Sequence, residues 1–238
     1  MEIGIIGLPQ SVKTTIFGAL SGGESSLGNA ILNSNKPNLG VAKVQDPRLN
    51  MLESMFNPAK TTPAEVKYID FPKSQEANIK SKGIYGEYLN SLQRADALLQ
   101  VVRSFEDPSV PHIEGSIDPI RDISLMDLEL SFSDLTILER RLEKLANELK
   151  STKSNERDIK LNEQVVLSRV KKDLEQEIPI REQEISEEEQ KILSNFQFLT
   201  AKPMLIVWNI GENELDKSQT IEDDLKSQFA RPGVGVVT

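Results

Sequence analysis

Cysteine is absent from this sequence of 238 residues, so disulfide bonds and thiolate metal sites are excluded. A single histidine, His112, argues against a histidine-rich zinc site and against a serine–histidine hydrolase. No apolar run approaches the roughly 20 residues that span a bilayer, and the start "MEIGII" lacks a basic leader. The net charge of −9 argues against nucleic acid wrapped over the whole surface. We therefore expect a soluble, cytoplasmic protein with no membrane partner and no direct DNA binding.

Short apolar segments alternate with helical segments along much of the chain. Several of the apolar segments, such as "LLQVV" and "MLIVW", are apolar on both faces, which is typical of a parallel sheet covered by helices. Helical patterns occupy 13–20 and 86–96. This alternation predicts a three-layer α/β domain with a mostly parallel sheet. The strand-like segments are 3–8, 40–44, 66–70, 98–103 and 203–209.

Residues 124–200 follow a different pattern. Apolar residues recur there at spacings of three and four, which predicts a long helix of the coiled-coil type. The polar stretch 151–158 breaks the pattern, and a second helical segment follows. An antiparallel helical hairpin is the simplest arrangement, because one apolar seam needs another to bury against. The seam consists of Leu125, Leu128, Phe132, Leu135, Leu138, Leu142, Leu145 and Leu149, and the second segment carries Leu167, Val170 and Leu174.

A third, shorter helix is predicted after the hairpin, because Ser186 and Glu189 have the spacing of a capping box. Strand character then returns in "AKPMLIVWN". The sequence thus predicts a discontinuous α/β domain formed by 1–123 and 201–238, with 124–200 inserted as a helical coiled-coil hairpin. We expect the leucine seam to serve packing rather than partner binding, although both remain open at this point.

The stretch "GLPQSVKTT", residues 7–15, lies between the first strand-like segment and the first helical one. It fits the phosphate-binding loop G-x-x-x-x-G-K-[ST] at Gly7, Lys13 and Thr14. In such a loop the backbone N–H groups and the helix N-terminus surround the phosphates, the lysine neutralises them and the hydroxyl binds Mg²⁺. The alternative is a glycine loop that only turns the strand into the helix.

Val12 occupies the position of the second glycine of that pattern. Glycine is used there because its backbone can take angles that a Cβ resists, and a β-branched residue is poorly suited to them. We therefore expect either a shifted loop or fewer hydrogen bonds to the phosphates, with one or two phosphate oxygens left without a donor.

With these segments together, the chain resembles the Obg-like ATPase (YchF) family, a branch of the P-loop translation-factor GTPase class. The resemblance is carried by the phosphate loop, by "NLGVAKVQDPRL" (38–49), by "QVVRSFEDPSVPHIEGSIDPIRDI" (100–123) and by "AKPMLIVWN". It extends through nearly the whole sequence. It implies a G domain interrupted by a helical coiled-coil insertion, and in that family a TGS domain follows. That domain does not occur within these 238 residues, which end in "GVGVVT".

Carried over position by position, the resemblance implies a site for a nucleoside triphosphate and Mg²⁺. Switch I falls near Ser34, and switch II falls on "DFPK", where Asp70 is kept and Lys73 replaces a glycine. The ammonium of Lys73 would either replace the missing N–H as a donor to the γ-phosphate or leave the γ-phosphate without that donor. The implied nucleotide contacts are Gly7, Pro9, Gln10, Ser11, Val12, Lys13, Thr14, Thr15, Asn209 and Glu212. The implied Mg²⁺ ligands are Thr14, Ser34 and Asp70.

The base-reading motif of GTPases, Asn-Lys-x-Asp, is replaced here by "NIGE", from Asn209 to Glu212. The resemblance implies the family's preference for ATP over GTP and a ribosomal or translation-factor partner. Gln75 lies too far along the pattern to orient a water molecule, so hydrolysis is expected to be slow and the catalytic residues stay unassigned. His112, in "HIEG", is expected to be a hydrogen-bonded structural residue rather than a contact of the site.

Two functions follow from these observations. The first is a nucleotide-dependent switch that binds ATP and hydrolyses it slowly. The second is a degenerate, nucleotide-blind scaffold that acts through its helical hairpin, and its support is the pair of departures at Val12 and Lys73.

Overall fold

The computed structural model describes residues 1–22, 37–71, 84, 86–151 and 154–238. The strands are β1 (Glu2–Ile6), β2 (Asn38–Lys43), β3 (Glu65–Asp70), β4 (Ala97–Arg103), β5 (Met204–Asn209) and β6 (Val234–Val237). The α-helices are α1 (Lys13–Leu20), α2 (Pro47–Phe56), α4 (Gly86–Arg94), α5 (Pro119–Glu148), α6 (Ser154–Leu174), α7 (Glu187–Leu193) and α8 (Ser218–Gln228). The short 3-10 helices are η1 (Ile180–Glu182) and η2 (Glu212–Lys217).

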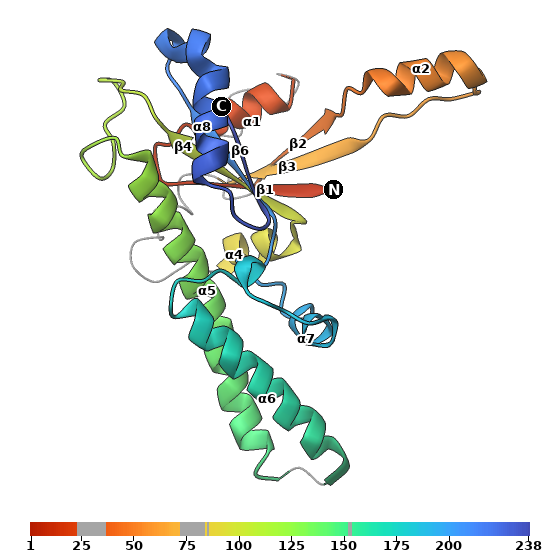
Figure 1. Cartoon of the computed structure of the whole chain (residues 1–238), viewed down its shortest axis with the longest axis vertical. Helices are drawn as coiled ribbons and strands as arrows, with labels where there is room; N and C mark the ends of the chain where they lie inside the picture. Colours follow the sequence, from red (N-terminus) through yellow and green to blue (C-terminus); the bar gives the residue numbers. More distant parts are fainter. Residues whose placement is uncertain (23–36, 72–83, 85, 152–153) are drawn as a thin grey trace.

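The six strands form one sheet in the order β2-β3-β1-β4-β5-β6 (Figure 1). Strands β1, β3, β4, β5 and β6 are parallel, and only the edge strand β2 is antiparallel, to β3. The predicted α/β class with a mostly parallel sheet is therefore confirmed. The chain passes from β1 to β3 on one side and then to β4 on the other, so β1 lies where the strand order reverses. In open α/β sheets, ligands bind outside the carboxyl ends of the strands at such a point.

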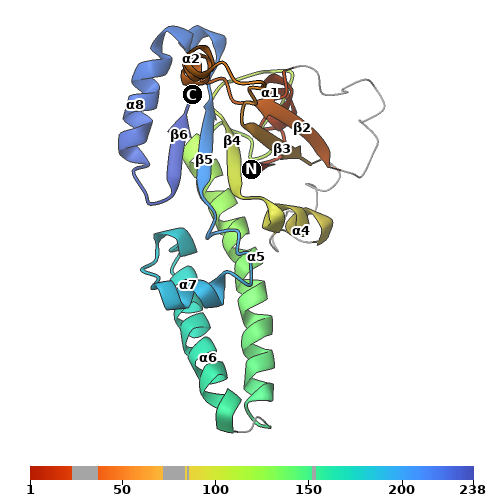
Figure 2. The ribbon, with the colours of Figure 1, turned by 90° about the vertical axis from the view of Figure 1, so that its right-hand side faces the viewer.

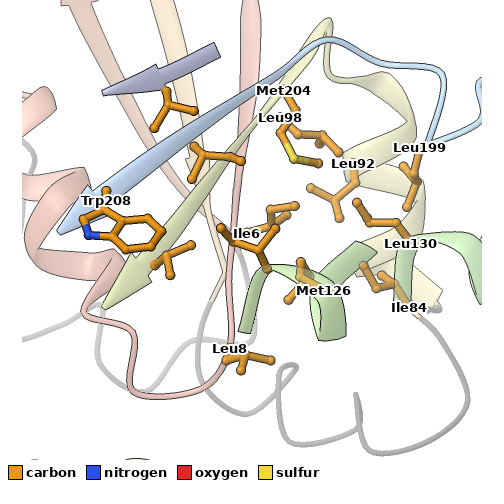
Figure 3. Packing of buried hydrophobic residues seen from close by; sticks show 14 of the residues in the cluster. Ile6, Leu8, Ile84, Leu92, Leu98, Met126, Leu130, Leu199, Met204 and Trp208 are labelled. Atoms are coloured by element: carbon orange, nitrogen blue, oxygen red, sulfur yellow. The ribbon is translucent and has the colours of Figure 1, made fainter. Parts of the chain in front are cut away.

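Both faces of the sheet are covered by helices. Successive residues of a strand point to opposite sides, so a strand that is apolar throughout has apolar side chains to bury on both faces. Ile5 packs with Phe17 of α1 on one face. Ile6 packs with Leu92 of α4 and Met126 of α5 on the other. Figure 3 shows this second cluster, in which side chains of β1, β4 and β5 meet those of α4 and α5. Because β1 is packed against helices on both sides, the loop that follows it starts from a well-packed strand end.

Helix α5 contributes to two cores. Its first part packs on the sheet through Ile123, Met126 and Leu130, and its second part packs on α6. The two helices run together away from the sheet as a hairpin, which both views show (Figures 1 and 2). The seam prediction was wrong for two of its members: Leu128 and Phe132 are 37% and 40% exposed. They are exposed because a different stripe of α5 faces the sheet. Coiled-coil geometry in the strict sense stays a prediction, as does the division of the chain at 123/124 and 200/201.

Other predicted boundaries can be compared with the structure. The break predicted at 151–158 is shorter, because α6 already begins at Ser154. The capping box of Ser186 and Glu189 is confirmed, with both of its hydrogen bonds present at the start of α7.

The end of the insertion is fixed to α5 by one buried carboxylate. Asp134 accepts hydrogen bonds from the N–H of Leu199 (2.9 Å) and from the N–H and hydroxyl of Thr200 (2.7 Å each). Burial raises the pKa of Asp134 to about 6, against the lowering effect of these hydrogen bonds. The connection back to β5 therefore depends on a polar group inside the core.

Helix α2 projects from the body of the protein (Figure 1). Asp46 caps it and Pro47 opens it, yet none of its residues is buried. Met51, Met55 and Phe56 are more than 60% exposed. No helix in the described part of the chain is both long enough and apolar enough to cross a membrane.

Candidate nucleotide-binding site

The loop from Gly7 to Val12 joins β1 to α1 at the carboxyl edge of the sheet. A Cβ on Gly7 would lie 2.5 Å from the carbonyl oxygen of Val101 and 2.8 Å from Oγ of Ser11. Glycine is therefore required here by the close approach of the loop to β4. The N–H of Ser11 donates to the carbonyl of Leu8 (3.2 Å), which closes the turn.

Val12 has φ 70° and ψ 27°, the left-handed conformation that glycine adopts freely. Its carbonyl accepts hydrogen bonds from the N–H groups of Thr15 (3.1 Å) and Ile16 (3.4 Å), so it forms the N-terminal cap of α1. The backbone at this position thus keeps a glycine-like geometry in spite of the isopropyl group. The predicted shortage of hydrogen bonds to the phosphates stays a prediction.

Lys13 points back into the loop. Its ammonium group donates to the carbonyls of Gly7 (2.9 Å) and Leu8 (2.8 Å) and lies 3.4 Å from Oγ of Ser11. The residue is only 5% exposed. A buried cation is thus held at the loop by backbone dipoles. Thr14 and Thr15, which follow it on the first turn of α1, are exposed.

Asp70, the last residue of β3, is 1% exposed. Its Oδ2 accepts hydrogen bonds from the hydroxyl of Thr14 (3.4 Å) and from the side-chain amide of Asn38 (3.3 Å). Its Oδ1 is buried with no hydrogen-bond partner among the described residues. Burial raises the pKa of Asp70, while Asn38, the charge of Lys13, the hydroxyl of Thr14 and the backbone N–H of Phe71 act in the opposite direction. Asp70 is thus a buried carboxylate beside the loop, close enough to Lys13 for the charge of that lysine to act on it.

The residues fit Mg²⁺, a hard cation that binds oxygen ligands and keeps several waters. Thr14 supplies a hydroxyl oxygen and Asp70 a buried carboxylate with one unused oxygen. Within the part of the chain that the structure describes, no group of three or more His, Cys, Asp or Glu side chains forms a metal cluster. The predicted ligand Ser34 and the substituted position Lys73 both lie outside the described residues.

The predicted base-reading residues follow β5. Asn209 ends the strand, its side chain is half-buried and its carbonyl accepts a hydrogen bond from the N–H of Ser104 (2.8 Å). Glu212 is exposed and opens η2. Since β1, β3 and β5 are parallel, their carboxyl ends lie on the same edge of the sheet. The loop of Lys13, the carboxylate of Asp70 and the turn after Asn209 are therefore on one edge.

Pro9 and Gln10 form the outer part of the loop. Pro9 is half-buried, and Gln10 is exposed with a positive φ of 67°. The assignment of both residues as nucleotide contacts stays a prediction.

His112 is hydrogen-bonded, as the sequence predicted. Its Nδ1 accepts from the N–H of Glu114 (3.2 Å), which leaves the proton on Nε2, and Nε2 donates to Oδ2 of Asp122 (2.8 Å). Arg121 donates to the other oxygen of Asp122. His112 therefore fixes the loop before α5.

Two residues of the site region were missed by sequence reasoning. Asn38 faces Asp70 because β2 and β3 are antiparallel in the register that pairs these residues. Arg103, at the end of β4, is 2% exposed and binds three backbone carbonyls. Arg103 could have been found from the sequence, because it belongs to the motif "VVRSFED". The contact of Asn38 could not, because it depends on the register of β2 against β3, which no residue pattern indicates.

Together the fold and the loop define a P-loop protein with a G-domain-like sheet and a helical insertion. Comparison with known proteins agrees. The chain is 34% identical over 215 residues to the ribosome-binding ATPase YchF of Bacillus subtilis, covering 90% of this chain and 58% of that protein. It is 33% identical over 214 residues to Obg-like ATPase 1 of Caenorhabditis elegans, covering 90% of this chain and 53% of that protein.

Among solved structures, the YchF GTPase of Schizosaccharomyces pombe superposes with a TM-score of 0.79 at 27% identity. The match covers all of this chain and 64% of that one. No protein-family model matches the chain. The chain is therefore related to the Obg-like ATPase (YchF) family, as its motifs predicted, and it spans between about half and two thirds of the length of these relatives.

Proposed function

We propose that the protein binds a nucleoside triphosphate with Mg²⁺, prefers ATP to GTP, hydrolyses it slowly and acts as a nucleotide-dependent switch linked to ribosomes. The observation that carries this proposal is the pairing of a buried lysine in a P-loop turn with a buried, half-satisfied carboxylate 3.4 Å from the hydroxyl of Thr14. Both charges lie at the point of the sheet where α/β proteins bind ligands.

The loop residues would hold the phosphates. The N-terminus of α1 offers backbone N–H groups and the positive end of the helix dipole to an anion. Lys13 would exchange the carbonyls of Gly7 and Leu8 for phosphate oxygens. Each charge-assisted hydrogen bond of this kind contributes about 1.5–3 kcal/mol. Mg²⁺, held by Thr14 and Asp70, would neutralise the phosphate charge.

The proposed preference for ATP rests on the turn after β5. A GTPase holds the guanine N–H groups with an aspartate two residues beyond a lysine, and the turn here is Asn209-Ile-Gly-Glu212. Slow hydrolysis is proposed because Gln75, the glutamine that follows "DFPK", lies too far along the pattern to orient a water molecule.

The proposed link to ribosomes rests on relatives, such as the Bacillus subtilis protein, that are named ribosome-binding ATPases. The helical hairpin gives no independent support for RNA contact, because several of its basic side chains are engaged with carboxylates. Arg141 pairs with Glu163 at 2.6 Å and Lys160 with Glu148 at 3.0 Å. A ribosomal contact through this hairpin would therefore use protein surfaces more than phosphate charge.

Titration of fluorescent ATP and GTP analogues, each with and without Mg²⁺, tests the proposal. The parent should bind the ATP analogue in the micromolar range, more tightly than the GTP analogue. Lys13→Ala should weaken binding at least tenfold, and Asp70→Asn should remove most of the Mg²⁺ dependence. Lys226→Ala is the matched control, because this exposed lysine of α8 pairs with Glu222 of its own helix and should change nothing in nucleotide binding.

The competing function is the nucleotide-blind scaffold. The observation in its favour is the isopropyl group of Val12 at the helix cap. It predicts no saturable binding of either analogue by the parent at millimolar concentration. That result, with a folded protein, would overturn the proposed function.

A further inference from the structure

Arg103 is an unusual buried cation. Among the described residues it is the largest side chain that is almost completely buried, and it forms no ion pair there, although its charge contributes to the lowered pKa of Asp107. Burying an unpaired charge is costly unless its donors are satisfied. Here the compensation comes from backbone carbonyls, so the side chain must fix the conformation of the segment that supplies them.

The carbonyls belong to the loop that follows β4. Nε donates to the carbonyl of Phe105 (2.9 Å), Nη1 to that of Val110 (2.7 Å) and Nη2 to that of Asp107 (3.4 Å). The guanidinium also lies 5.1 Å from the centre of the Phe105 ring, within the range of a cation–π interaction. One planar group thus gathers three points of the loop 105–110, which a lysine ammonium cannot do in the same geometry.

The same loop is joined to the turn after β5. Arg103 is the ladder partner of Asn209, and the N–H of Ser104 donates to the carbonyl of Asn209. One residue further on, Phe105 approaches Gly211 so closely that a Cβ on Gly211 would lie 3.3 Å from Cβ of Phe105 and 2.6 Å from Oδ1 of Asn213. The loop 105–110 is therefore in direct contact with the turn 209–212.

We propose that Arg103 is a positioning residue for nucleobase recognition: by holding the loop 105–110, it sets the position of the turn 209–212 and so the choice between adenine and guanine. This inference rests on the proposed nucleotide binding, and it concerns the base rather than the phosphates. Arg103 contacts no base itself and acts through Phe105 and Gly211.

The inference separates two parts of the binding energy. The triphosphate would be held by the loop 7–15, whereas the hydrogen bonds of Arg103 go to the loop 105–110. A change at Arg103 should then affect ATP and leave Mg²⁺-tripolyphosphate, which has no base, unaffected. A purely structural role would weaken both together.

The test measures three dissociation constants, for ATP, GTP and tripolyphosphate, each with Mg²⁺, by displacement of a fluorescent ATP analogue. Arg103→Lys keeps the charge and should raise the dissociation constant for ATP about tenfold. The ratio of the dissociation constants for GTP and ATP should move toward one, and the dissociation constant for tripolyphosphate should stay within twofold of that of the parent. Gly211→Ala places a Cβ 3.3 Å from Cβ of Phe105, as well as against Oδ1 of Asn213 within the turn, and should produce the same pattern. Because the two changes share one interface, the effect of the double variant should be smaller than the product of the single effects.

The outcomes are distinguishable. If the parent binds neither ATP nor tripolyphosphate, the proposed function fails and this inference fails with it. If the parent binds ATP and both variants keep its affinity and its base preference, the inference is overturned while nucleotide binding stands. If a variant loses tripolyphosphate by the same factor as ATP, Arg103 is structural only, and the inference is again overturned. Gly211→Ala decides between these outcomes should Arg103→Lys fail to fold.

Discussion

Replacing Val12 by glycine at the N-terminal cap of α1 should make the protein more stable. Val12 has φ 70° and ψ 27°. For a residue with a Cβ, this conformation costs about 1–2 kcal/mol, and branching at Cβ adds to the crowding. Glycine removes that cost but gains freedom in the unfolded chain, worth about 0.5–1 kcal/mol. The free energy of unfolding should therefore rise by about 0.5–1 kcal/mol.

The same substitution should tighten nucleotide binding. Without the isopropyl group, the backbone at the cap of α1 is open to a phosphate oxygen. One recovered charge-assisted hydrogen bond, at about 1.5–3 kcal/mol, lowers the dissociation constant for Mg²⁺-ATP by tenfold or more. Stability and affinity should therefore improve together, since one side chain opposes both.

Urea denaturation gives the stability and fluorescent-ATP titration the affinity, with Val12→Ala as the matched control. Alanine lacks the branch but keeps a Cβ in the left-handed region, so its stability should stay below that of Val12→Gly. For a domain of this size, 1 kcal/mol corresponds to a shift of about 2–4 °C in Tm. If the glycine variant is no more stable than the alanine variant, the left-handed conformation of Val12 is not a source of strain and the reasoning is refuted.

Three further changes test other parts of the structure. Because burial raises the pKa of Asp134 to about 6 from an ordinary 3.8, its contribution to stability is full only well below pH 4 and is lost as pH rises through 6. The advantage of the parent over Asp134→Asn should shrink by about 2 kcal/mol between pH 4 and 7, and urea denaturation showing a constant difference would contradict this. Gly7→Ala places a Cβ against the carbonyl of Val101, which cannot yield, and should cost about 2–3 kcal/mol by the same assay. Arg141→Met removes the two hydrogen bonds to Glu163 that join α5 to α6 and should lower the stability of the hairpin by about 1 kcal/mol, with unchanged ATP binding.

Elements with a buried face could be predicted from the sequence, and elements without one could not. Strand β4 was predicted because all seven of its residues are buried and six are apolar or amide. Helix α2 was missed although Asp46 and Pro47 are good start signals, because its apolar residues face solvent and give no amphipathic stripe that matches a core. The residue pattern puts the start of α6 too late because the first residues of this helix are polar. Polar residues can belong to a helix when the apolar residues further along it are buried against a partner helix.

The candidate site divides in a similar way. The loop 7–15 could be predicted because its function depends on a short, contiguous pattern in which each residue type has a chemical role. The hydrogen bond from Asn38 to Asp70 depends on strand register, and a shift of one residue would have turned the amide away. The role of Arg103 depends on carbonyl groups, which every residue has, so no side-chain pattern could show where its donors go.

The balance of buried charge bears on the choice between a switch and a scaffold. Lys13 and Asp70 are 5% and 1% exposed, and replacing a buried pair of opposite charges by apolar residues is often neutral or stabilising. A scaffold that never binds nucleotide therefore gains nothing from them. Among the described residues, one oxygen of Asp70 also has no hydrogen-bond partner, and burying such an oxygen costs about 1–3 kcal/mol. In a protein that binds Mg²⁺ and phosphate, the same two groups regain partners when the ligand arrives, and the cost in the free protein becomes part of the binding energy.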